Sequence, residues 1–288
     1  MIFSEELENL LKTKIKCIWI NTYEEEKVML EIKNIIASKF PNMKLNTWSF
    51  LLGLKEEKLN KSIPDPKDYK NMPPDVVLKT IFKEQFEEDS SALWIFKDGH
   101  MLSDIKPFIR GVRDLKEISK TNSYNPIIII SPLTDIPIEQ EKLWTVLNYE
   151  LPTEEELFKL SQSAIRAMQL KNSKGISIPN DEELRRCAKL AVGLTLNQAK
   201  EYIAKSIKLF GTIKEDMFFQ ARIDLINKTG VLEYSDCKMN LEDMGGNSNF
   251  KNWILDIKET FSKEAEDFGV EKSKGFLALG IPGQLNVV

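Results

Sequence analysis

The residues that suggest chemistry most directly lie near the end of the chain, in a turn behind an apolar run. The turn reads Gly280, Ile281, Pro282 and Gly283. A turn of this kind after a strand can direct its backbone N–H groups toward a phosphate. The full phosphate-loop pattern, G-x-x-x-x-G-K-S/T, is not completed, because residues 285–287 read Leu-Asn-Val. The turn therefore predicts a partial phosphate loop that lacks the phosphate-binding lysine and the Mg²⁺-binding hydroxyl.

Outside this turn, side chains that could do chemistry are sparse. His100 is the single histidine, and the three cysteines lie far apart at positions 17, 187 and 237, without a C-x-x-C pair. These spacings favour a reducing compartment and argue against a disulfide framework or a zinc site. Asp98 and His100 form the one acid–histidine cluster, which we interpret as a solvated loop rather than a catalytic dyad. We predict no catalytic residue and no metal ligand.

Several basic and aromatic residues have both a structural and a functional interpretation. Lys12, Lys14 and Lys16 alternate before a strand and are interpreted as an exposed face rather than a nucleic-acid stripe. Arg110 and Arg113 could act between subunits, but exposed helix charges are the favoured interpretation. Four tryptophans fall in predicted strands, where core packing is favoured over base stacking. They are Trp19, Trp48, Trp94 and Trp144.

The composition is that of a globular chain with room for two domains. Its 288 residues are 29% charged and 42% hydrophobic, with a formal net charge of −4. This balance argues against nucleic acid as a partner, because phosphate neutralisation needs clustered Lys and Arg. No apolar run approaches the roughly 18 residues of a membrane span, and the acidic amphipathic N-terminus is unlike a signal peptide. We expect a cytoplasmic protein without a membrane partner.

Residues 1–150 alternate apolar runs with helical segments, and this order predicts a largely parallel α/β sheet. The apolar runs are short and continuous, which is typical of strands covered on both faces. The Lys-, Asp- and Pro-rich segment 53–74 is predicted as a loop. The expected strands lie at 15–20, 45–52, 92–96, 127–130 and 145–149, with helices at 24–38 and 75–86.

Residues 151–230 are predicted to be helical only. Four positions place a capping side chain three residues before Glu or Gln, the pattern of a capping box. Glycines stand where those helices would end. A polar linker, 231–247, follows this small helical subdomain. The predicted boxes are Thr153–Glu156, Asn180–Glu183, Thr195–Gln198 and Thr212–Glu215, and the glycines are Gly193, Gly211 and Gly230.

The tail, residues 248–288, contains an expected helix at 248–261 and a strand at 276–281. Three segments in and just before this tail resemble the opening of an AAA+ ATPase module. They are LEDMGG at 241–246, which includes Gly245 and Gly246, FGV at 268–270 and KGFLALGIPG at 274–283. Taken alone, the turn at 280–283 could equally be a plain turn after an edge strand, without a phosphate-binding role. The three elements in this order favour the phosphate loop, so the resemblance implies nucleotide binding at Gly245, Gly246 and the turn 280–283.

The first 230 residues resemble a degenerate AAA+ core with its helical lid. The line from IIIISP at 127–132 to LPTEEEL at 151–157 is similar to the end of such a core. Where a phosphate loop should follow the first strand, the chain reads NTYEEE at 21–26, and Lys97 stands where the metal-binding acid of the third strand belongs. We interpret Thr22 and Glu25 as a capping box, and the three glutamates as repelling a triphosphate.

The whole order resembles the AAA ATPases of the chloroplast and cyanobacterial hypothetical-reading-frame type, also found in bacteria and phages. The resemblance implies an ATP-driven remodelling protein that uses ATP and Mg²⁺ when full length, acting as a homo-oligomer or with other AAA+ subunits. It also extends the expected location to the plastid stroma. We expect the chain to end inside a second module and not to hydrolyse ATP. The alternative is a complete, non-catalytic scaffold that modulates AAA+ partners, or a clamp-loader-like subunit.

Overall fold

The computed structural model describes residues 3–57, 66–87, 91–118, 123–134, 136–170, 179–228, 241 and 248–271. The chain divides into two compact units, residues 1–225 and 226–288. The predicted strand at 276–281 and the predicted helix end at Gly230 lie outside the described residues. The finer boundaries at 150, 230 and 247 stay predictions.

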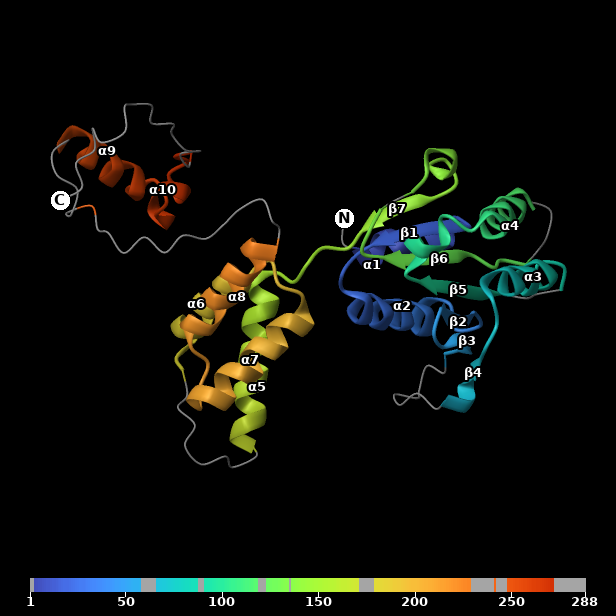
Figure 1. Ribbon diagram of the computed structural model, residues 1–288, viewed down its shortest axis with the longest axis horizontal. Helices are drawn as coiled ribbons and strands as arrows, with labels where there is room; N and C mark the ends of the chain where they lie inside the picture. The colour runs from blue at the N-terminus through green and yellow to red at the C-terminus, as the bar shows by residue number, and fades with distance from the viewer. Residues whose placement is uncertain are drawn as a thin grey trace. The chain divides into compact units, whose positions relative to one another are not determined.

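The strands of residues 17–148 form a seven-stranded sheet in the order β4-β3-β2-β5-β6-β1-β7 within the first unit (Figure 1). Strands β2, β5, β6, β1 and β7 are mutually parallel, which confirms the predicted α/β class. Only β3 and β4 run antiparallel to their neighbours, at one edge. The strands are β1 Cys17–Asn21, β2 Lys44–Ser49, β3 Gly53–Glu56, β4 Tyr69–Lys70, β5 Ala92–Lys97, β6 Ile127–Ser131 and β7 Thr145–Asn148.

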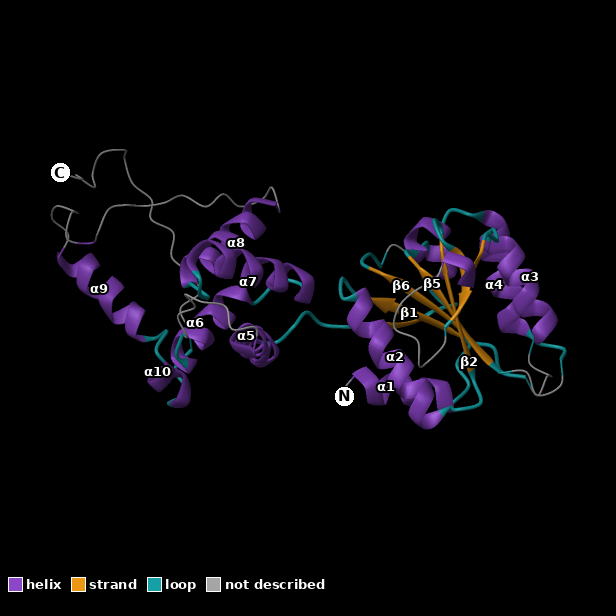
Figure 2. Cartoon of the chain, turned by 90° about the horizontal axis from the view of Figure 1, so that it is seen from below, coloured by secondary structure: helices purple, strands orange, loops and turns teal. Residues whose placement is uncertain are grey.

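Helices cover both faces of this sheet, as the continuous apolar strands predict (Figure 2). Alternate residues of β1 point to opposite faces: Ile18 and Ile20 pack with α1 and α2, whereas Cys17 and Trp19 pack with α3 and α4. The four tryptophans of the predicted strands are buried, in line with the core interpretation. The helices are α1 Phe3–Lys12, α2 Glu25–Lys39, α3 Pro74–Glu84 and α4 Lys106–Glu117.

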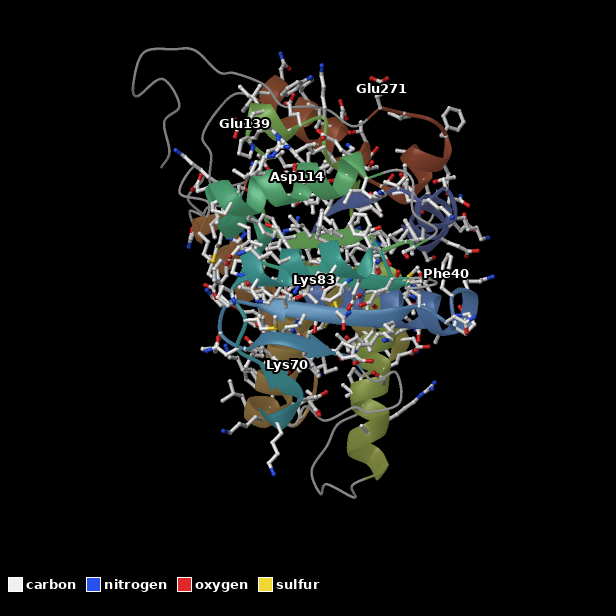
Figure 3. All side chains as sticks on the ribbon, turned by 90° about the vertical axis from the view of Figure 1, so that its right-hand side faces the viewer. Phe40, Lys70, Lys83, Asp114, Glu139 and Glu271 are labelled. Carbon is white, nitrogen blue, oxygen red and sulfur yellow. The ribbon has the colours of Figure 1, made fainter. Side chains whose placement is uncertain are left out.

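The prediction of a plain loop over 53–74 is wrong, because this segment adds β3 and β4 to the sheet. Gly53 has a φ of +74°, and a Cβ atom there would lie 2.2 Å from the carbonyl oxygen of Lys70. Only glycine allows the two strands to approach so closely in this conformation. In Figure 3 the labels Lys70, Lys83 and Asp114, from bottom to top, mark β4, α3 and α4.

Four helices follow the sheet: α5 Glu154–Leu170, α6 Asp181–Ala191, α7 Leu196–Phe210 and α8 Glu215–Lys228. Reciprocal hydrogen bonds form the capping boxes predicted for α5, α6 and α7. The fourth box is wrong, because α8 begins only at Glu215, which pairs with Arg186 at 2.6 Å. Gly193 and Gly211 adopt the positive φ that helix ends favour.

The second unit contains α9 Ser248–Glu259 and α10 Lys263–Asp267. The apolar stripe predicted for the first of these lies on a helix in which no residue is buried. Phe250 and Trp253 stack on each other at 6.0 Å between ring centroids. None of the described helices combines the length and the hydropathy that crossing a membrane requires.

Candidate functional site at the carboxyl edge of the sheet

The phosphate-binding residues predicted from the sequence belong to the tail, and all of them lie outside the described residues. They are Gly245, Gly246, Gly280, Ile281, Pro282 and Gly283. In the described part of the chain, polar side chains gather at the carboxyl ends of β1, β5 and β6. Open α/β sheets bind ligands at this edge, where the strand order reverses. The candidate site that can be built from contacts is therefore the one at the carboxyl edge of the sheet, in the first half of the chain.

The turn after β1 is short and closed by its own hydrogen bonds. Three residues separate the end of β1 at Asn21 from the start of α2 at Glu25. The backbone N–H of Thr22 donates to Ser131 O of β6 at 2.8 Å, and the Thr22 hydroxyl accepts from the N–H of Glu24 at 2.9 Å. The predicted capping box between Thr22 and Glu25 is wrong, because α2 has Glu24 at its N-cap. A three-residue turn is too short to surround a phosphate as the eight-residue loop pattern does.

Glu24 is buried, with 5% of its surface exposed, and its carboxylate contacts another helix. Its Oε1 atom accepts a hydrogen bond from the N–H of Leu196 at 2.6 Å. Leu196 is the first residue of α7, and a helix N-terminus favours an anion through its free N–H groups and its dipole. A carboxylate of the chain itself thus occupies the anion position at the start of α7.

Glu25 and Lys97 form an ion pair across the site, with Nζ and Oε1 2.8 Å apart. Lys97 ends β5, so the pair joins the first turn of α2 to the carboxyl end of the third predicted strand. A lysine at this position cannot hold Mg²⁺, which prefers oxygen ligands. Glu25 thus engages the ammonium group of Lys97, which could otherwise contact a phosphate.

The next two residues of α2 also contact the helices after the sheet. The Glu26 carboxylate accepts from the Asn197 side chain at 3.4 Å, and Lys27 pairs with Glu156 at 2.6 Å. Together with Glu24, these contacts join the start of α2 to the first turns of α5 and α7. All three glutamates of the predicted repulsive run are therefore used in internal contacts.

His100 lies beside this site and does not stand in a simple solvated loop, as the sequence suggested. Its Nδ1 atom is 2.9 Å from the hydroxyl oxygen of Ser131, which is fully buried at the end of β6. The Ser131 hydroxyl also accepts from the N–H of Leu133 at 3.2 Å. No group of metal-binding side chains occurs among the described residues. The pair stabilises the loop after β6, and the Ser131 hydroxyl is fully buried, so it is not accessible to a substrate as a nucleophile.

Together, these contacts do not fit ATP and Mg²⁺. The turn is short, the carboxylates of Glu24 and Glu26 contact neutral N–H donors and add negative charge, and Lys97 and Lys27 already pair with Glu25 and Glu156. Each uncompensated carboxylate near a phosphate adds Coulomb repulsion of about 1 kcal/mol per unit charge at 4 Å in water. The sequence indicated this charge, but nothing in it indicated Leu196 as the partner of Glu24.

A known protein family matches the part of the chain that contains the sheet, and the match ends before the later helices begin. Residues 3–149, about half of the chain, match the family model described as the SpoVK-like AAA ATPase, N-terminal domain. This range contains every strand of the described sheet and ends before α5.

Two relatives extend the similarity over almost the whole chain. The uncharacterized AAA domain-containing protein ycf46 of Guillardia theta is 30% identical over 98% of this chain and 53% of its own length. The ycf46 protein of Trieres chinensis is also 30% identical, over 98% of this chain and 54% of its length. The chain thus spans about half the length of the curated relatives it matches.

Among solved structures, the likeness concerns the fold alone. Caenorhabditis elegans PCH-2 superposes with a TM-score of 0.50 at 10% identity, over 77% of this chain and 65% of that one. The family model, the relatives and the strand order agree. The chain therefore belongs to the AAA+ ATPase family, among the SpoVK-like and ycf46-type proteins, and residues 3–149 are the part that matches the family's N-terminal domain.

Proposed function

We propose that residues 1–225 form a non-hydrolysing AAA-like domain of an ATP-driven remodelling protein. The observation that carries this proposal is the buried carboxylate of Glu24 on the N-terminus of α7. This contact and the Glu25–Lys97 pair use the groups that a nucleotide would need. The domain then serves as a structural half that needs no nucleotide to keep its carboxyl edge closed.

ATP hydrolysis, in this proposal, belongs to a module that begins in the tail of the chain. The resemblance of residues 241–246 and 274–283 to an AAA+ opening supports this assignment, with Gly245, Gly246 and Gly280–Gly283 around the phosphates. The ycf46 relatives are almost twice as long as this chain, so they have room for such a module. ATP and Mg²⁺ are then cofactors of that module.

The proposed setting is a homo-oligomer, or an assembly with other AAA+ subunits, in the cytoplasm or the plastid stroma. Membership of the AAA+ family supports the assembly, and similarity to ycf46 proteins supports the stroma. The second candidate is a scaffold that modulates AAA+ partners without hydrolysis, and the same closed edge favours it.

Calorimetry with ATP and ADP, each with and without Mg²⁺, tests the closed site on the whole chain. We expect no nucleotide binding that depends on Mg²⁺ or on residues 21–26, and no steady-state hydrolysis, because this site offers neither a loop nor a free cation. Replacing Glu24, Glu25 and Glu26 by serine should not restore binding, because the lysine and the loop length are still absent. Saturable binding that is weakened by changes at residues 21–26 would contradict the proposal.

Separating the two candidate functions needs a hydrolysis assay of the longer protein. ATP turnover that is lost on chelation of Mg²⁺ supports the remodelling ATPase. The scaffold is supported if the longer protein shows no ATP turnover of its own and this chain alters the turnover of another AAA+ protein.

A further inference from the structure

A cavity of about 430 Å³ lies at the amino edge of the sheet, opposite the site described above. It lies between the start of β1 at Cys17, the end of α4 at Lys116 and the approach to β7 at Leu143. Its volume falls in the range of about 300–1,000 Å³ that is common for small-molecule sites. This cavity is separate from the turn that carries Glu24, which follows the other end of β1.

Three lysines line the cavity: Lys14, Lys16 and Lys116. None of the described lining residues is acidic. Within the described ranges, none of the three lysines forms an ion pair with a carboxylate, whereas Lys12, two residues before Lys14, pairs with Glu8 at 2.5 Å. The cavity therefore concentrates positive charge in a chain whose net charge is −4.

Backbone carbonyls fix two of these ammonium groups in place. Lys16 Nζ donates to the carbonyl oxygens of Ile118 and, at 3.3 Å, Leu115, at the end of α4. The expectation of an exposed lysine face is wrong here, because Lys16 is half-buried. Lys116 Nζ donates to Lys142 O at 2.8 Å and Leu143 O at 2.7 Å.

Each ammonium keeps one of its three N–H donors after these contacts. Carbonyl oxygens bear only partial charges, so the full positive charges of Lys16 and Lys116 are not neutralised. Burial lowers the pKa of Lys16, since it disfavours the charged form. An anion in the cavity would offset this cost.

Lys14 contributes the third charge from a strained backbone. It follows the end of α1 with a φ of 58°, and its N–H donates to Leu11 O at 3.1 Å while that of Ile15 donates to Leu10 O at 3.0 Å. Helix ends of this shape favour glycine, because a Cβ atom makes the left-handed conformation costly. Strain of this kind in a non-glycine residue is common where the side chain has a binding role.

We propose that the cavity at the amino edge binds a small, multiply charged anion of phosphate chemistry, held by the ammonium groups of Lys14, Lys16 and Lys116. Lysine binds phosphate oxygens as a point charge, and three such charges match an anion with more than one negative charge. Ile15 and Ile118 also line the cavity, and their apolar side chains would contact an organic part of the ligand.

Calorimetry with pyrophosphate, at low ionic strength and on the whole chain, tests this site. We expect saturable binding that Lys14→Gly weakens about tenfold or more, since a hydrogen bond to a charged group contributes about 1.5–3 kcal/mol. Lys14→Arg keeps the charge and should stay within about threefold of wild type. Lys79→Ala, which removes an exposed lysine of α3, is the matched control and should bind as wild type does.

Unfolding does not confound this comparison, because Lys14→Gly relieves backbone strain and should leave the thermal midpoint unchanged or raised. Three results would overturn the proposal. These are no saturable heat with pyrophosphate, wild-type affinity in Lys14→Gly, and an equal loss in Lys79→Ala.

Discussion

Glu24 stabilises a helix to which it does not belong. Its carboxylate accepts the N–H of Leu196 in a buried position, so Glu24→Ala leaves a donor at the start of α7 without its partner. Loss of such a cap costs about 1–2 kcal/mol of the free energy of unfolding. We expect urea denaturation of Glu24→Ala to show that loss. Glu24→Gln should show a smaller loss, because an amide oxygen still accepts the bond.

Glu26→Ala is the matched control for this prediction, because Glu26 is exposed and only its 3.4 Å contact with Asn197 is lost. Its free energy of unfolding should stay within about 0.5 kcal/mol of wild type. Equal effects of the two alanine variants would contradict a specific role of Glu24.

Single residues also show what the sequence could predict about the site. The run of three glutamates and Lys97 in place of an acid are local features, and they indicate a site hostile to phosphate. The contact of Glu24 with Leu196 joins residues 172 positions apart, and no pattern in either segment specifies the other. The pairing of Glu25 with Lys97, instead of Thr22, arises because the helix begins at Glu25, a shift of the kind that propensity does not resolve.

At the scale of elements, Glu57 links α2 to the β2–β3 hairpin. Burial alone raises the pKa of Glu57, but hydrogen bonds from Lys33 at 2.9 Å and from Lys55 outweigh it. The pKa in the folded state therefore lies below the ordinary 4.5. The stabilisation is fully present above pH 4.5 and is lost as the pH falls through the lower, folded pKa.

Glu57→Gln should accordingly lower the free energy of unfolding by about 1 kcal/mol at neutral pH. Urea titrations between about pH 7 and pH 3 should show the difference from wild type shrinking toward acid. A difference that is independent of pH would show that the charge of Glu57 is not the source of the stabilisation.

The caps of the helices after the sheet provide an internal comparison. Asn180→Ala removes one half of the reciprocal box at α6 and should cost about 0.5–2 kcal/mol in thermal or urea unfolding. Thr212→Ala should change stability by less than about 0.5 kcal/mol, because α8 begins after its predicted box. A large loss of stability in Thr212→Ala would show instead that Thr212 does cap α8, as the sequence predicted.

Most elements follow from the sequence, and the exceptions have a common cause. The hydrophobic periodicity and the residues at the helix starts predict α2, α3 and the central strands within a few residues. Strands β3 and β4 are missed because they are short and lie in the segment 53–74, which is charged and rich in proline, and Gly53 is the local sign of the hairpin. Strand β3 pairs with β2, and β4 pairs with β3, through backbone hydrogen bonds that depend on tertiary contact rather than side-chain pattern.

At the scale of the whole molecule, α9 presents apolar side chains that are not buried. Trp253 in α9 is 40% exposed, and Phe261, two residues after α9 ends, is 56% exposed. Apolar groups of this kind gain free energy when covered. We expect the mass from light scattering to rise with concentration, or hydrogen exchange over 248–261 to be slow if the chain covers the helix itself. Trp253→Ser should weaken either effect, while Lys251→Ala should not.

A strict monomer at every concentration, together with fast exchange throughout α9, would contradict both forms of this prediction.

The bond between Glu24 and Leu196 also sets an order of events during synthesis. A ribosome adds about 5–20 residues per second, so the 172 residues between the partners take on the order of ten seconds or more to emerge. During that interval the first strand and helix are already outside the ribosome, but the carboxylate that will be buried must stay hydrated. The carboxyl edge of the sheet can close only after α7 has been made, so the nascent domain passes through an open form that the finished protein no longer has.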